Sequence, residues 1–128
     1  MGGFRGKDRE QIEIEIEVVH KAKNTSANTH IRGVVQDRAQ ARVVGTIKVL
    51  PGAQQVNSFL TEKLLILSDK ARAEVVPNLE IEADEVKCSH AATVGKVDEE
   101  QLFYLMSRGL RRDQAEDIIV EGFLAPVA

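Results

Sequence analysis

The sequence predicts a mainly β protein, with a solenoid of stacked strands over residues 11–96 and a small helical region over residues 97–128. Apolar and polar residues alternate with a period of two through much of the first region, which is typical of half-buried strands. Apolar anchors recur there at steps of 15 to 17 residues, which indicates stacked rungs. After Gly95 the apolar period becomes that of a helix.

The first ten residues, MGGFRGKDRE, are rich in glycine and charge, so residues 1–10 are expected to form a leader or disordered end. In the next segment, QIEIEIEVV, apolar residues alternate with Glu13, Glu15 and Glu17. Such a strand has one apolar and one solvated face. The glutamates could bind a divalent cation, but a solvated outer face explains them more simply.

The later strands continue the alternation and divide between two sheets. Two steps make one turn of roughly 31 residues. The anchors expected to stack are Ile16, Ile47 and Leu79 in one sheet and Ile31, Leu64 and Val94 in the other. An antiparallel jelly roll could give a similar spacing. The links carry few hairpin signals, of which Pro51-Gly52 is the clearest, and this favours the solenoid.

Two short helices are expected after the strands. Asp98 can cap the first helix, and Gln101 three residues later completes a capping box. Gly109 stands where a helix end favours a left-handed residue. The second helix is expected from about Asp113 to about Phe123. Because the pair is short, its apolar faces need the solenoid end or a partner to cover them.

Composition excludes several classes of function. The 128 residues carry a net charge of −3, so no global attraction to nucleic acid or to a membrane surface is expected. No apolar stretch approaches the roughly 18 residues of a membrane span. Neither a P-loop nor a glycine-rich dinucleotide fingerprint occurs. The single cysteine rules out a disulfide framework, and a reducing compartment, the cytoplasm, is expected.

Cys88 and His90 are the residues best suited to chemistry. They stand two apart in VKCSHAATVG, a segment with strand character, so their side chains share a face. Thiolate and imidazole suit zinc, copper or iron, but a complete site needs about four ligands, and a second chain would have to supply the others. On spacing alone, a buried cysteine beside a hydrogen-bonded histidine is the simpler explanation. A cysteine nucleophile is disfavoured because no orienting third residue stands out.

The segment LFYLMSRGLRR is a second candidate site. It offers Phe103, Tyr104 and Arg108, and Tyr and Arg are enriched at the energetic centres of protein interfaces. A helix stripe of this kind can equally belong to the core.

From about Leu64 to Phe123, many residues occur in the same order as in the core domain of the SufB/SufD iron–sulfur cluster assembly family, which this part of the chain resembles. LEIEADEVKCSHAATVG holds the most characteristic block, QLFYLMSRGL continues it, and a weaker likeness reaches back through GVVQDRAQARVVGTIKV. The resemblance implies a right-handed parallel β-helix with a helical C-terminal region. It also implies a scaffold rather than an enzyme, with no catalytic residue.

The resemblance further implies partners and a cargo. A SufB-like or identical core domain would pair through the β-helix, and a SufC-type ATPase would dock on the C-terminal helices. Candidate docking residues are Phe103, Tyr104, Arg108, Gly109 and Phe123. The Cys-x-His arrangement is similar to the SufD branch, whereas the SufB branch carries a further cysteine near Glu62. Cys88 and His90 would then be ligands of a transient iron–sulfur cluster shared with a partner chain.

Two alternatives remain open from the sequence. The chain could be a pure interaction module of the same complex, without metal chemistry of its own. It could also be an unrelated β-solenoid or sandwich enzyme with a metal at Cys88 and His90.

Overall fold

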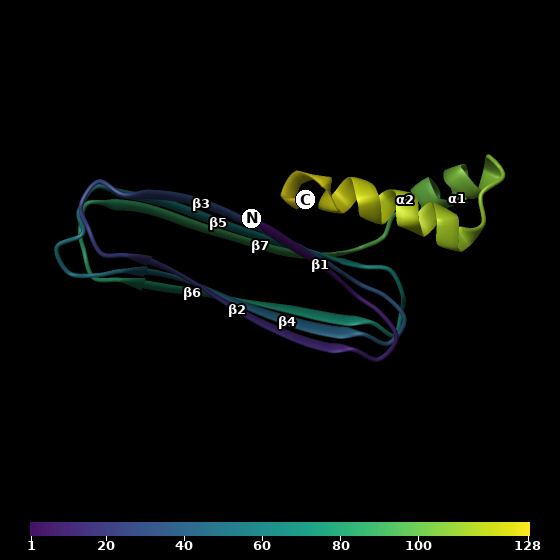
Figure 1. The fold of residues 1–128 in the computed structure, drawn as a ribbon, viewed down its shortest axis with the longest axis horizontal. Helices are drawn as coiled ribbons and strands as arrows, with labels where there is room; N and C mark the ends of the chain where they lie inside the picture. The colour runs from purple at the N-terminus through teal and green to yellow at the C-terminus, as the bar shows by residue number, and fades with distance from the viewer.

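The computed structural model describes residues 1–128 as a parallel β-solenoid of about three turns followed by two helices, as the sequence predicts (Figure 1). The strands are β1 Gly2–Gly6, β2 Gln11–His20, β3 Ser26–Val35, β4 Gln40–Val49, β5 Val56–Ile66, β6 Arg72–Ile81 and β7 Val86–Lys96. The helices are α1 Glu99–Ser107 and α2 Arg112–Leu124, and a short 3-10 helix follows at Ala125–Val127.

The strands alternate between two parallel sheets that face each other (Figure 1). One sheet has the order β1-β3-β5-β7 and the other the order β2-β4-β6. Alternate residues point into the space between the sheets, where Val43, Ile47 and Leu60 are completely buried or nearly so. The period of two in the sequence therefore marks the inner and outer faces of each rung.

The register agrees with the expected stacking in part. Leu79 stands beside Ile47, and Val94 stands beside Leu64, as predicted. In the first turn the neighbour of Ile47 is Val18 rather than Ile16, and the neighbour of Leu64 is Gly33 rather than Ile31. The rungs differ in loop length, so a constant step misplaces the anchors of the first turn.

The N-terminal residues differ from the expected disordered end. Gly2–Gly6 form β1 and pair in parallel with β3. The ring of Phe4 lies so close to Gly33 that a Cβ there would overlap it. The glycine-rich composition predicted a frayed end, because composition does not reveal whether a segment has a strand to pair with. The edge of β3 provides that strand.

The helices pack on the outer face of the four-stranded sheet, near the end of β7 (Figure 1). Leu102, Ala115 and Val120 form a buried cluster with Val34, Leu67 and Val97 of the strand ends. Asp98 caps α1 by accepting from the backbone N–H groups of Glu100 and Gln101. Gly109 has φ of 98°, as its predicted place after the helix requires. Neither helix is long and apolar enough to cross a membrane.

The last turn of the solenoid leaves part of its inner face uncovered. Leu79, Ile81 and Val94 continue rows that are buried in the preceding turn, yet they are 50%, 40% and 44% exposed. Strands β6 and β7 end their sheets, so each also has a free backbone edge. This exposed end of β6 and β7 is called the terminal rung below.

Candidate functional site

Cys88 and His90 both lie on the inner face of β7, the last strand of its sheet. Their neighbours on β5 are Ser58 and Leu60 respectively, and both of these are buried. The expectation that the two side chains share a face is therefore confirmed, and that face belongs to the terminal rung. No disulfide involves Cys88, which is partly buried.

A buried glutamate meets His90 inside the solenoid. The Glu62 side chain is 0% exposed and the His90 side chain is 2% exposed. Glu62 Oε2 lies 3.0 Å from His90 Nε2. Glu62 points inward from β5, and its other oxygen approaches Gly45 on the facing sheet. A Cβ at Gly45 would overlap that oxygen and lie 2.9 Å from Leu60 Cδ2. The carboxyl group therefore fits only because residue 45 has no side chain.

Burial shifts the ionisation of both candidate groups. It raises the pKa of Glu62, while the hydrogen bond and charge of His90 act in the opposite direction. Burial also raises the pKa of the Cys88 thiol. Because a thiolate is the ligand form of cysteine, metal binding at Cys88 would have to release a proton.

Several buried polar atoms at this site have no partner within the chain. In the whole chain, four buried side-chain atoms lack a partner: His20 Nε2, Ser58 Oγ, Glu62 Oε1 and His90 Nδ1. The last three come from the inner faces of β5 and β7. Buried polar groups are nearly always hydrogen-bonded. Ser58, Glu62 and His90 thus place three unpaired polar atoms on the inner faces of the two strands that meet at Cys88.

The donors present fit a metal or cluster only in part. A thiol and an imidazole are suitable ligands for iron–sulfur chemistry. No three His, Cys, Asp or Glu side chains come together as a metal site within the chain. The chain thus brings together two donors of this kind, Cys88 and His90, on one face of β7.

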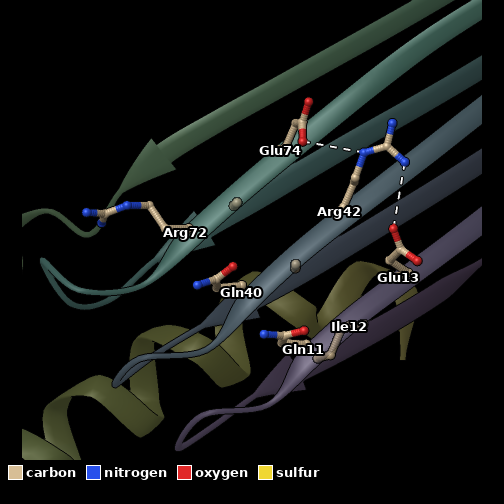
Figure 2. Close-up of a pocket in the computed structure, with 9 residues that line it drawn as sticks. Gln11, Ile12, Glu13, Gln40, Arg42, Arg72 and Glu74 are labelled. Atoms are coloured by element: carbon tan, nitrogen blue, oxygen red, sulfur yellow. Dashed lines mark ion pairs between the residues drawn. The ribbon is translucent and has the colours of Figure 1, made fainter.

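The glutamates of β2 lie on the outer face of the three-stranded sheet, as a solvated strand requires. Arg42 on β4 lies between Glu13 of β2 and Glu74 of β6 (Figure 2), at 3.8 Å from the first and 3.4 Å from the second. These side chains line a shallow hollow with the stacked Gln11, Gln40 and Arg72 (Figure 2). Since an arginine already lies between two of the carboxylates, the hollow does not resemble a cation site.

The candidate docking residues separate into two groups. Phe103 and Tyr104 are 73% and 55% exposed on α1, and the Arg108 guanidinium donates to the Tyr104 hydroxyl at 2.9 Å. Gly109 follows them in the turn. Phe123 lies elsewhere: it packs against the helix–sheet cluster, and its ring is 5.2 Å from the Arg32 guanidinium.

Glu62, Ser58 and Gly45 were not recognised from the sequence as parts of the site. The available signal was the inward phase of β5, where a serine and a glutamate interrupt the row Val56, Leu60 and Leu64. Adding one turn to Glu62 leads to β7 near His90. The role of Gly45 depends on contact between facing sheets, which spacing within a strand does not reveal.

Comparison with known proteins gives a family match and several relatives that all belong to one family. Residues 2–123 match the family described as SUF system FeS cluster assembly, SufBD core domain. The iron–sulfur cluster assembly protein SufD of Bacillus subtilis is 40% identical over 123 residues, which are 96% of this chain and 28% of that protein. SufD of Escherichia coli is 41% identical over 92 residues, which are 72% of this chain and 22% of that protein.

A SufBD family protein of Pyrococcus horikoshii is 41% identical over 96 residues, which are 75% of this chain and 21% of that protein. The chain thus spans less than a third of the length of each of these relatives. The family match covers nearly the whole chain and agrees with the parallel solenoid. The chain belongs to the SufBD core-domain family of the SUF system for iron–sulfur cluster assembly.

Proposed function

We propose that this chain is a SufD-like scaffold that takes part in building or transferring iron–sulfur clusters, and that it is not itself an enzyme. The observation that carries the proposal is the position of Cys88 and His90. Both lie on the inner face of the terminal rung, beside exposed apolar residues that a second chain could cover. A cluster held there would be cargo in a reducing compartment such as the cytoplasm.

Pairing would occur at the terminal rung. Leu79, Ile81 and Val94 expose apolar surface there, and the free edges of β6 and β7 offer unpaired backbone groups. A SufB-like core domain, or a second copy of this chain, would extend the sheets and bury these side chains. Both sources of stability, strand pairing and apolar burial, act at the same surface.

Cluster binding would require ligands from both chains. This chain would offer the His90 imidazole and, after loss of its proton, the Cys88 thiolate. A cluster commonly takes four ligands, so the partner would supply the others. Because each chain holds only part of the set, separation of the pair would release the cargo.

ATPase docking would occur on the exposed face of α1. Phe103 is largely exposed. The Arg108 guanidinium lies over the Tyr104 ring, 5.1 Å from the ring centre, and this contact orders the Arg108 and Tyr104 side chains before binding. Gly109 would shape the turn that follows. Phe123 would contribute indirectly, by holding α2 against the sheet. ATP-driven movement of the partner could then reach the terminal rung through β7, which leads directly into α1.

The test is reconstitution of the chain with a SufB-like partner and the ATPase, with iron and sulfide supplied. We expect His90→Ala and Cys88→Ala each to lower cluster absorbance several-fold while the complex still assembles. His30→Ala is the matched control, because His30 lies on the outer face of β3. Normal cluster formation in the Cys88→Ala, His90→Ala double variant would contradict the proposal.

The absence of three converging ligands within the chain also suits a pure interaction module. In that case the chain would recruit the ATPase and pair normally, and the double variant would carry as much cluster as the wild type. Phe103→Ala should weaken ATPase binding under either function, so the cluster measurement is what separates them.

A further inference from the structure

We propose that Glu62 is a positioning residue for His90: its carboxylate accepts the Nε2 proton, so that Nδ1 is the ring nitrogen left free for a metal cation. The inference rests on the proposed function, since it concerns how the same histidine would bind its cargo. It assigns roles to two residues outside the Cys-x-His pair, Glu62 and Gly45.

The first step is that stability does not explain a glutamate at this position. Its neighbours in the inward row of β5 are Leu60 and Leu64, both buried and apolar. A leucine would fit the same row, whereas removing a carboxylate from water costs several kcal/mol unless it is well paired. Glu62 has a single hydrogen-bond partner, His90, and its second oxygen has none.

The second step is that the chain makes room for the carboxylate at a specific place. Residue 45 on the facing sheet must be a glycine to leave space for the carboxylate, because a Cβ there would overlap Glu62 Oε1. The arrangement therefore involves three strands: β4 supplies the space, β5 the carboxylate and β7 the imidazole. Such support by a carboxylate is usual for histidines that bind metals, since it fixes the ring and its tautomer.

The third step identifies the free ring atom. His90 Nδ1 is buried and has no partner in the chain. A proton on Nδ1 would therefore be a buried donor without an acceptor, the rarer and costlier kind of unpaired group. Only the form with the ring proton on Nε2, facing Glu62 Oε2 at 3.0 Å, avoids this. It leaves a lone pair on Nδ1, which a cation can use, and a nearby carboxylate that balances the cation's charge.

The experiment is a long-range ¹H–¹⁵N spectrum of the full chain labelled at histidine, with the His90 signals assigned by His90→Ala. We expect the wild type to carry the ring proton on Nε2 and none on Nδ1. In Glu62→Leu the ring proton should exchange with water at least about tenfold faster, as loss of a hydrogen bond to a charged acceptor implies. Glu62→Gln retains an acceptor and should retain the Nε2 tautomer.

Gly45→Ala keeps the glutamate but displaces it, so it should reproduce the faster exchange seen in Glu62→Leu. Gly95→Ala is the control, because a Cβ at Gly95 meets nothing within 4 Å. A wild-type ring proton on Nδ1 would overturn the proposal, as would an exchange rate that neither Glu62→Leu nor Gly45→Ala changes.

The spectra are recorded on the chain alone, so they decide the role of Glu62 whether or not the complex holds a cluster. In the reconstituted complex, Glu62→Leu should lower cluster absorbance to the same extent as His90→Ala. If the wild-type complex forms no cluster, the proposed function fails, and the tautomer result still stands by itself.

Discussion

At the scale of single residues, burial of Glu62 should make stability depend on pH. Burial raises the pKa of Glu62 above its ordinary value of 4.5, so the folded chain keeps this proton to a higher pH than the unfolded chain does. The stability contributed by the protonated form is complete below pH 4.5 and is lost as the pH rises through the folded-state pKa.

We therefore expect the free energy of unfolding of the wild type to fall relative to Glu62→Gln as the pH rises above 4.5. The limiting slope for one proton is about 1.4 kcal/mol per pH unit. Urea unfolding of both proteins at a series of pH values measures the difference. A difference that stays constant would show that Glu62 titrates normally, and one that changes in favour of the wild type would show that its pKa is lowered in the folded chain. Either result would contradict the prediction.

Cys88 provides a second prediction at this scale. Because burial raises the pKa of its thiol, the folded chain should hold less thiolate at neutral pH than the unfolded chain. Since thiolate is the reactive form, iodoacetamide should alkylate the folded chain several-fold more slowly than the chain in denaturant. The rate is measured by mass spectrometry, with a short cysteine peptide in the same denaturant as the control. Equal alkylation rates in the folded and the denatured chain would mean that burial does not lower the reactivity of the Cys88 thiol.

At the scale of elements, neighbouring residues of α1 have different tasks. Leu102 is buried against the outer face of the sheet, whereas Phe103 is largely exposed. We expect Leu102→Ala to lower the free energy of unfolding by about 2–5 kcal/mol, the usual cost of truncating a buried leucine. Phe103→Ala should cost less than about 0.5 kcal/mol. Thermal and urea unfolding of the two variants compare their free energies of unfolding, and the two residues are adjacent on the same helix.

If Phe103→Ala proved as costly as Leu102→Ala, the exposed face of α1 would be part of the folded core and could not be a docking surface. If instead Phe103→Ala alone weakened ATPase binding, the two faces of the helix would be functionally separate. The stability measurement therefore comes before any binding experiment.

Elements also differ in how far the sequence predicted them. The period of two located the strands from Gln11 onward, and Asp98 and Gly109 located the ends of α1, because these signals act within a few residues. Strand β1 was missed, since only its pairing with β3 stabilises it. In the candidate site, the spacing of Cys88 and His90 predicted their shared face on one strand, and the structure has it. Glu62 and Gly45 were missed because they meet across strands and sheets.

At the scale of the whole molecule, we expect the terminal rung to determine where the solenoid associates. The outer face of the three-stranded sheet carries charged pairs such as Arg42 with Glu74, which keep that face in water, and the helices cover part of the outer face of the other sheet. The terminal rung, in contrast, exposes apolar side chains and free strand edges. Association is therefore expected at this end rather than along the sides, which also brings a partner to Cys88 and His90.

Two adjacent residues of β6 can test this. Leu79 continues the inner row beside Ile47, while Asn78 stands beside Thr46 on the outer face. Leu79 is half-exposed in the single chain, so Leu79→Lys should cost little stability but place a charge within the pairing surface. We expect it to weaken pairing at least tenfold, and Asn78→Lys to leave pairing unchanged. Sedimentation of the chain alone and with a SufB-like core domain measures both, and unchanged pairing in Leu79→Lys would exclude the terminal rung as the interface.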